Sequence, residues 1–496
     1  MRPKRRSAAL TDPHHDELDT KIMRGSAWSA LGYGGANVFG LVTTVVLARL
    51  LAPDDFGVIA LALALLAVAQ IAQESGLGAA LIVHRRDLRR AAATVSIFSP
   101  LVALLLYTIF FVGAPVAADF FDEARLTDVL RVMALVLVLR GLAIMPRALL
   151  ERQMRFGPIT AIELGAGFAQ AATAIALAYG GAGLWSLVAG QLAFGGAMAA
   201  LSWAFSPLWP SPFDARRETL RELVAYGRHV GVANLLNYGN VNAQGIVVGR
   251  VLGTTALGYY SIASRLAYMP VGVAGNIVGR GVFSALSRVA DDRERFRQIW
   301  LENVQRLALL STPAAIGIAL VADPFVTTFL GERWESAIVP LQILALNGVV
   351  APFAATSGEV FQALGRPKLR VVAESMYLVL IVPALVIGAE WHGIVGAAAA
   401  VVLVNGAFGI GVLAFMTRLL GVQVRELGHA IVRPALGWAV MAISMLALHP
   451  VVDEQSAAVS LIALVAVGAG VYGLFVWLLA RDLVATMWVN LRGVRS

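Results

Sequence analysis

Two arginines lie deep inside long apolar segments, where an ionised side chain is costly unless it is paired or hydrated. Arg140 lies well inside the segment 128–146, and Arg265 lies inside the segment 257–280. A guanidinium is planar and carries several N–H donors, so it can bind the oxygens of a phosphate at two points. Arg140 could instead hold a structural pair with a carboxylate or with carbonyls at a helix end, and both side chains could instead snorkel to the membrane surface. Both are therefore candidate ligands for an anionic group.

Amide side chains are concentrated in another apolar segment, 225–249. Asn234, Asn237 and Tyr238 share one face there if the segment is helical. Amides in hydrocarbon need hydrogen-bonding partners, so this density favours the wall of a hydrated cavity. The alternative is hydrogen bonding between helices, which contributes only about 0.6 kcal/mol per contact. Asn37, in the first apolar segment, is expected to face this wall.

Carboxylates near the ends of apolar segments are the remaining candidates. They could act as ion-coupling groups or as a gate, or they could form salt bridges to loop arginines such as Arg155 and Arg370. The four glutamates concerned are Glu74, Glu163, Glu359 and Glu374.

Acid–base pairs, metal-ligand clusters and phosphate-binding glycine loops are not recognisable in the sequence. The chain has no cysteine, which excludes disulfides and thiolate metal sites. Gly-Tyr-Gly-Gly at 32–35 lies within an apolar segment and has no Lys-Ser/Thr pair after it. We therefore expect no catalytic residue, no metal and no cofactor.

The composition places the chain in a membrane. Of its 496 residues, 58% are hydrophobic and 14% are charged, and the mean hydropathy is +0.75. A soluble domain carries roughly a quarter charged residues, whereas an apolar run of about 20 residues crosses a bilayer as a helix. The sequence thus predicts an all-α membrane protein of about fourteen transmembrane helices. The expected spans are 25–48, 57–82, 94–114, 128–146, 158–180, 182–205, 225–249, 257–280, 303–322, 335–356, 371–389, 393–417, 431–449 and 457–480.

The distribution of Lys and Arg predicts the orientation of these spans. Of the 39 basic residues, 32 fall on the side that holds both termini, and 4 fall in the opposite loops. Basic residues accumulate in short cytoplasmic loops, so both termini are expected in the cytoplasm. The net charge of +8 is then a consequence of topology, and a nucleic-acid partner is not needed to explain it.

The chain also resembles itself. Arg-Leu-Leu-Ala-Pro-Asp-Asp-Phe-Gly at 49–57 returns as Arg-Val-Leu-Gly-Thr-Thr-Ala-Leu-Gly at 250–258, and Phe120 matches Phe329 further on. Six spans per copy keep both copies in the same orientation, so the repeat predicts two parallel bundles with a site between them. The expected divisions are a cytoplasmic tail 1–24, a first six-helix bundle 25–205, a cytoplasmic linker with an interfacial helix 206–224, a second six-helix bundle 225–417, two extra helices 431–480 and a cytoplasmic tail 481–496.

Four stretches resemble a known family. They are Ala-Arg-Leu-Leu-Ala-Pro-Asp-Asp-Phe-Gly at 48–57, Glu-Ser-Gly-Leu-Gly-Ala-Ala-Leu-Ile at 74–82, Phe-Leu-Gly-Glu-Arg-Trp at 329–334 and Gln-Ala-Leu-Gly-Arg-Pro-Lys at 362–368. With the arrangement of six, six and two helices, they resemble the polysaccharide flippases of the multidrug/oligosaccharidyl-lipid/polysaccharide exporter superfamily, of the teichuronic-acid and colanic-acid type.

The resemblance implies a function, a location and partners. It implies a flippase that moves a polyprenyl-pyrophosphate-linked glycan from the cytoplasmic to the outer face of the bacterial plasma membrane by alternating access. The expected partners are this lipid-linked glycan, membrane lipid, and the polysaccharide polymerase and glycosyltransferases of the same pathway. Arg140 and Arg265 would then neutralise the pyrophosphate, and the polar segment 225–249 would line the sugar path.

Two other classes stay open. The first is an ion-coupled exporter of drugs or small molecules from the same superfamily. Such exporters often carry an acidic residue deep in the first helix, and 25–48 has neither Asp nor Glu. The second is a membrane glycosyltransferase or polysaccharide ligase, which would place catalytic residues in a large outer loop that is missing here.

Overall fold

The computed structural model describes residues 35, 39–73, 77–84, 86–354, 357–452 and 454–479. For some of these residues, among them 226–238 and 276–284, it describes the backbone and not the side chain. The described part contains helices and no strand. After an apolar helix Phe39–Leu50, the elements are α2 (Pro53–Gln73), α3 (Ala79–Val83), α4 (Leu88–Phe121), α5 (Arg125–Met133), α6 (Leu135–Arg152), α7 (Phe156–Tyr179), α8 (Leu184–Ala204), η2 (Pro212–Asp214), α9 (Arg217–Arg288), α10 (Arg293–Phe325), η3 (Val326–Leu330), η4 (Glu332–Ala337), α11 (Ile338–Ala345), α12 (Asn347–Ala354), α13 (Ser357–Ala363), α14 (Pro367–Leu420), α15 (Val424–Val452) and α16 (Ala457–Leu479).

Eleven of the described helices are long and apolar enough to cross a membrane. Two of them are far too long for one crossing, because a straight helix of the length of α9 would extend over about 108 Å. α9 is interrupted at Gly253, whose φ of 83° lies in the left-handed region that glycine tolerates, and α14 is interrupted at His392 and Gly393. Both interruptions fall where the sequence predicts a loop between two spans. The all-α membrane fold is confirmed, whereas the number of fourteen crossings stays a prediction.

The ends of several helices follow from local chemistry. The Asp87 side chain accepts hydrogen bonds from the backbone N–H groups of Arg89 and Arg90, which caps the first turn of α4. Asp292 caps α10 in the same way through the N–H of Arg295. The C-terminal end of α14 is set by Gly421, which adopts a left-handed conformation that stops the helix.

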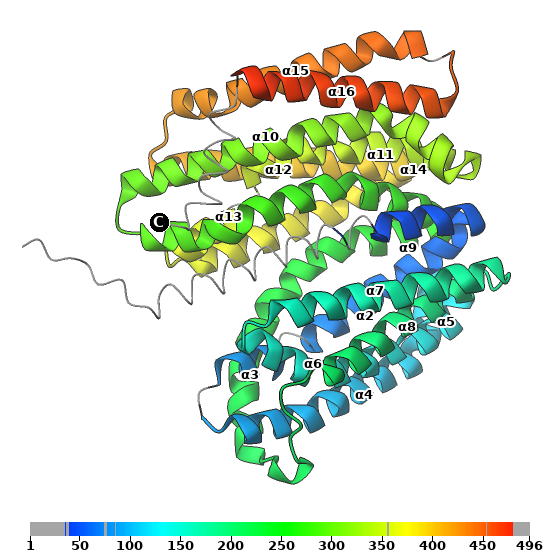
Figure 1. Cartoon of the computed structure of the whole chain (residues 1–496), viewed down its shortest axis with the longest axis vertical. Coiled ribbons are helices and arrows are strands. Elements are labelled where there is room, and N and C mark those ends of the chain that lie inside the picture. Colours follow the sequence, from blue (N-terminus) through cyan, green and yellow to red (C-terminus); the bar gives the residue numbers. More distant parts are fainter. Residues whose placement is uncertain are drawn as a thin grey trace, which may run out of the picture.

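The helices form two lobes (Figure 1). The first lobe contains residues 39–204, and the second contains residues 217–420, with α9 packed on both α14 and α2. The pair α15 and α16 packs on the outer side of α10. The predicted boundaries of the two bundles and of the two extra helices stay predictions.

The largest buried cluster joins the lobes near the turns at residues 52 and 254. It contains Val58 and Leu61 of α2, Val248 and Tyr260 of α9, and Leu344 of α11. Smaller clusters lie elsewhere. One of them is inside the second lobe, where Phe296 and Trp300 pack with Met416. Another packs the start of α9, through Leu223, against the first lobe. The main hydrophobic core shared by the lobes is therefore the one at the two turns.

Candidate functional site

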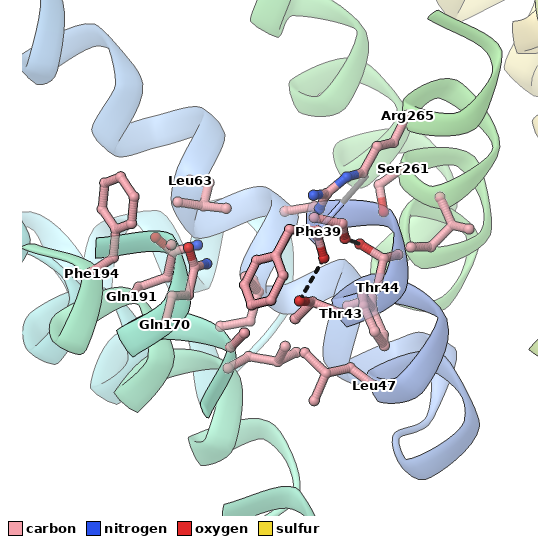
Figure 2. A pocket seen from close by; sticks show the side chains of 18 of the residues that line it. Phe39, Thr43, Thr44, Leu47, Leu63, Gln170, Gln191, Phe194, Ser261 and Arg265 are labelled. Atoms are coloured by element: carbon pink, nitrogen blue, oxygen red, sulfur yellow. Dashed lines mark hydrogen bonds between the residues drawn. The ribbon is translucent and has the colours of Figure 1, made fainter. Parts of the chain in front are cut away.

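A cavity of about 480 Å³ lies between the lobes. Its walls come from the helix Phe39–Leu50, α2, α7 and α8 of the first lobe, and from α9 of the second. Most of the lining is apolar, and the polar side chains are few. They are Thr43, Thr44, Glu163, Gln170, Gln191, Ser261 and Arg265. Figure 2 shows Gln170 and Gln191 side by side on one wall and Arg265 entering from the other.

Arg265 carries the charge in this cavity from the side of the second lobe. Ala263 and Ala267, on other faces of the same helix, are fully buried, while the Arg265 side chain is exposed to the cavity. Its Nη2 lies 3.2 Å from the place that a Cβ on Gly40 would occupy, so the glycine lets the guanidinium approach the first-lobe helix. Among the described residues, no carboxylate lies within ion-pair distance of Arg265. Its positive charge is thus presented to the cavity.

A second cavity of about 460 Å³ lies on the other side of Arg265, between α2, the two halves of α9, and α14. Ala60, Ser261 and Arg265 line both cavities, so Arg265 stands at their junction. The second cavity is richer in hydrogen-bonding side chains than the first. They are Asn240, Asn242, Gln244, Tyr260, Ser264, Tyr268, Tyr377 and Asn405.

Hydrogen bonds hold the walls of this second cavity in place. The Tyr260 hydroxyl donates to Gln244 Oε1 at 2.9 Å, which ties the two halves of α9 together across the break at Gly253. Asn240 Nδ2 donates to Glu374 Oε2 at 2.6 Å and so links α9 to α14. The Oδ1 atom of Asn240 is buried and accepts no hydrogen bond from any described residue. The wall therefore has a hydrogen-bond acceptor, Asn240 Oδ1, to which no described residue donates.

Arg140 lies elsewhere, in a third cavity of about 420 Å³ inside the first lobe. Arg147 and Glu151 of the same helix also line it, and Met198 is the residue that it shares with the cavity between the lobes. Arg140 Nη1 donates to Gln70 Oε1 at 3.2 Å, and the guanidinium lies 5.6 Å from the centre of the Phe194 ring. The structure thus does not bring Arg140 and Arg265 into one cavity.

The predicted carboxylates are partly explained by ion pairs. Glu163 Oε1 accepts from Arg147 at 2.5 Å, so Glu163 forms a salt bridge, and its partner is Arg147 of α6. The pairing of Glu374 with Arg370 is confirmed, although it is loose at 3.8 Å. Glu163 lines the cavity between the lobes, whereas Arg147 lines the third cavity. This ion pair consequently forms part of the wall between them.

Several predicted site residues fall outside the described part of the chain. Asn37 and Glu74 belong to this group, and so do the side chains of Asn234, Asn237, Tyr238 and Glu359, although α9 and α13 themselves are described. Their proposed roles stay predictions.

Asn240, Asn242 and Gln244 of the second cavity lie in the amide-rich segment 225–249, for which the sequence predicted a cavity wall, whereas the tyrosines and Asn405 were missed. Ser261, Arg265 and Tyr268 follow one another at helical spacing, as do Asn240 and Gln244, and this periodicity could have placed them on common faces. Gln170 and Gln191 carry no such signal, because each is the only strongly polar residue in its part of an apolar helix.

The arrangement of the helices is that of known membrane transporters. The chain superposes on the lipid II flippase MurJ in an inward closed conformation with a TM-score of 0.74 and 13% identity, covering 92% of this chain and 99% of that one. It also superposes on the inward-facing conformation of a multidrug resistance MATE family transporter of the MOP superfamily, with a TM-score of 0.62, 15% identity, and coverage of 78% and 94%. Together with the eleven apolar helices, this fold makes the chain a multi-pass membrane protein.

The family is narrower than the fold. Residues 46–339 match the family described as polysaccharide biosynthesis protein, and the chain belongs to this family. The teichuronic acid biosynthesis protein TuaB of Bacillus subtilis is 25% identical and is covered over 75% of its length by 73% of this chain. The lipopolysaccharide biosynthesis protein WzxC of Escherichia coli is 23% identical, with coverage of 79% and 78%.

Proposed function

We propose that the protein is a flippase that moves a polyprenyl-pyrophosphate-linked glycan from the cytoplasmic to the outer face of the bacterial plasma membrane by alternating access. The observation that carries this proposal is the position of Arg265, a cation at the junction of two cavities between two lobes. The family and the curated relatives, which include a succinoglycan biosynthesis transport protein of Rhizobium meliloti, support the same substrate class.

The three parts of such a substrate match three kinds of surface. Arg265 binds the pyrophosphate, because its fork of N–H donors fits phosphate oxygens and its charge has no described carboxylate beside it. The amides and hydroxyls of the second cavity bind sugar hydroxyls, and Gln170 and Gln191 offer the same groups across the first. The polyprenyl chain remains in the lipid. Arg140, Asn37, Asn234, Asn237 and Tyr238 stay proposed contributors to this path.

A coupling ion would most readily act at Glu374. Of the four predicted carboxylates, this one is bonded to a residue that lines the second cavity, Asn240, and its ion pair with Arg370 is long. Glu163 is bound tightly to Arg147 and fits a structural role between two cavities better. Glu74 and Glu359 stay gating or coupling candidates on the sequence alone.

Orientation and partners complete the proposal. Both termini lie in the cytoplasm, as the distribution of the 39 basic residues favours. The glycosyltransferases that assemble the glycan supply the substrate on the cytoplasmic side, and a polymerase receives it on the other side.

The test is made in the organism that carries the gene. We expect that deletion of the gene stops extracellular polysaccharide and leaves radiolabelled lipid-linked glycan on the cytoplasmic face. Mild periodate should then oxidise this glycan in lysed spheroplasts and spare it in intact ones, while complemented cells show oxidation in both. If polysaccharide and glycolipid are unchanged by deletion and the cells instead accumulate a cationic dye, the protein is a drug exporter and the proposal is wrong.

A further inference from the structure

The two turns that repeat in the sequence meet each other in the structure, backbone against backbone. A Cβ on Gly57 would lie 1.7 Å from the carbonyl oxygen of Thr254, and a Cβ on Gly258 would lie 1.8 Å from that of Pro53. The two contacts are equivalent, because Gly258 is the repeat partner of Gly57 and Thr254 is the repeat partner of Pro53. The contact is thus made twice about a pseudo-two-fold axis, as at the interface of a symmetric dimer.

A second pair of contacts follows the same symmetry. Arg49 of the first lobe donates from Nε to the carbonyl oxygen of Phe329 in the second lobe, at 2.7 Å. Its repeat partner Arg250 lies over the ring of Phe120, the repeat partner of Phe329, with 5.2 Å from the guanidinium carbon to the ring centre. Each arginine therefore reaches from its own lobe to the matching phenylalanine of the other.

Polar groups join the lobes beside these contacts. The Thr254 hydroxyl lies 2.8 Å from Asp54 Oδ1 and 2.9 Å from Glu123 Oε2, and Arg125 pairs with both carboxylates. The Arg125 guanidinium, and after it the Thr254 hydroxyl, hold the pKa of Glu123 below its usual range, although partial burial opposes this. The Trp334 indole N–H also donates to the carbonyl oxygen of Ala48 at 2.8 Å, inside the shared hydrophobic core.

We propose that these paired turns form a latch that closes the cavities toward the outer face of the membrane, opposite the two termini, and must separate in every transport cycle. The latch consists of Gly57, Gly258, Arg49, Arg250 and the cluster around Thr254. The latch rests on the proposed function in one respect, because that function supplies the transport cycle in which the lobes separate. Two features support it: the largest buried core that the lobes share lies at this end, and the backbones of the two turns touch at Gly57 and Gly258.

Close backbone approach is what a closure of this kind requires. With hydrogen at Cα, the turns approach until backbone atoms touch, and no side chain holds the lobes apart. A methyl group at either glycine overlaps a carbonyl oxygen that belongs to a helix and cannot rotate away. A substitution at either glycine should thus hinder closure and leave the interior of each lobe unchanged.

The first experiment measures closure by the accessibility of a cysteine placed in the cysteine-free chain at Ser261, which lines both cavities. With an impermeant thiol reagent, we expect Ser261→Cys to react in inverted vesicles and to be shielded in intact cells. Gly57→Ala or Gly258→Ala in this background should increase labelling in intact cells about tenfold or more, because overpacking opposes the closed state. The side from which the unaltered background reacts also reports the orientation of the chain.

Gly113→Ala is the matched control, because Gly113 lies in a helix of the first lobe with no neighbouring atom within 4 Å of its added methyl group. It should leave labelling and export unchanged. The proposal is overturned if Gly57→Ala and Gly258→Ala, at normal abundance, label like Gly113→Ala.

A second experiment keeps the latch shut and does not depend on the folding of the glycine variants. We expect the pair Asp54→Cys and Thr254→Cys, joined by a short cleavable thiol cross-linker, to lose export about tenfold or more relative to the same cells without cross-linker, since the lobes can no longer part. Cleavage should restore export. The control pair Arg297→Cys and Glu426→Cys replaces an ion pair of 3.2 Å between α10 and α15, away from the lobe interface, and should export equally before and after cross-linking.

The two readouts separate the latch from the proposed function. Cysteine labelling does not depend on which substrate is carried, so a changed labelling pattern supports the latch even if the glycan assignment fails. Export that continues through the cross-linked Asp54–Thr254 pair contradicts the latch and leaves the flippase function intact.

Discussion

Arg140 and Arg265 both lie well inside apolar helical segments, yet they occupy two different regions of the molecule. Arg140 lies inside the first lobe beside Gln70 and Phe194, with a cavity that is lined by residues of that lobe alone. Arg265 lies between the lobes, at the junction of two cavities. A group inside one lobe moves with it as a rigid body, whereas a group between lobes changes its surroundings when they move apart. A position deep in an apolar segment thus marks both arginines as candidate site residues. The helix face on which each one lies decides whether it is inside one lobe or between the two.

The largest effect is expected from Arg265→Ala. Loss of two charge-assisted hydrogen bonds to phosphate costs about 3 kcal/mol, or roughly a hundredfold in apparent affinity. We therefore expect export to fall to a few per cent of wild type, measured as extracellular polysaccharide at equal protein abundance. Arg265→Lys should recover part of it, because lysine keeps the charge and loses the planar fork. Normal export by Arg265→Ala would show that transport does not need the positive charge of Arg265.

A smaller effect on export is expected from Arg140→Ala. This change removes the hydrogen bond to Gln70 and the contact with the Phe194 ring, so it should lower the stability of the first lobe by about 1–2 kcal/mol. Export per folded molecule should fall less than about fivefold, since the bound phosphate is held by Arg265. Melting temperature in detergent and export are measured together. The comparison is reversed if Arg140→Ala stops export at normal stability while Arg265→Ala does not.

The smallest effect is expected from Tyr377→Phe in the second cavity. One hydroxyl is lost from a wall that retains several other polar groups, which corresponds to about 1 kcal/mol, or roughly fivefold in apparent affinity. Tyr107→Phe, on α4 and outside the cavities described above, is the matched control and should have no effect. Equal export by the two variants would show that this cavity does not bind the sugar.

The sequence predicted the broad architecture because composition and periodicity decide it. Few charges and long apolar runs favour helices in lipid, and the predicted loops at 250–256 and 390–392 contain the break residues Gly253 and His392. The repeat at 49–57 and 250–258 also identified two turns that touch each other at equivalent positions in the structure.

The sequence could not predict which surfaces meet. The sequence shows that Glu163, a carboxylate in an apolar helix, needs a partner, but only the packing of α6 against α7 decides that this partner is Arg147. The same limit applies to Arg140, because the apolar residues around it do not distinguish the inside of a lobe from the space between lobes. Gln244 and Tyr260 become neighbours only because the chain reverses at Gly253.

The duplicated contact at Gly57 and Gly258 has a consequence for how such a protein can evolve. In a dimer of identical subunits, every mutation at a symmetric interface alters both copies of the contact together. Here the two copies lie in one polypeptide, so Pro53 and Thr254 differ while both turns carry a glycine. A substitution can therefore change the balance between open and closed states at one copy of the contact while the other copy stays as it is.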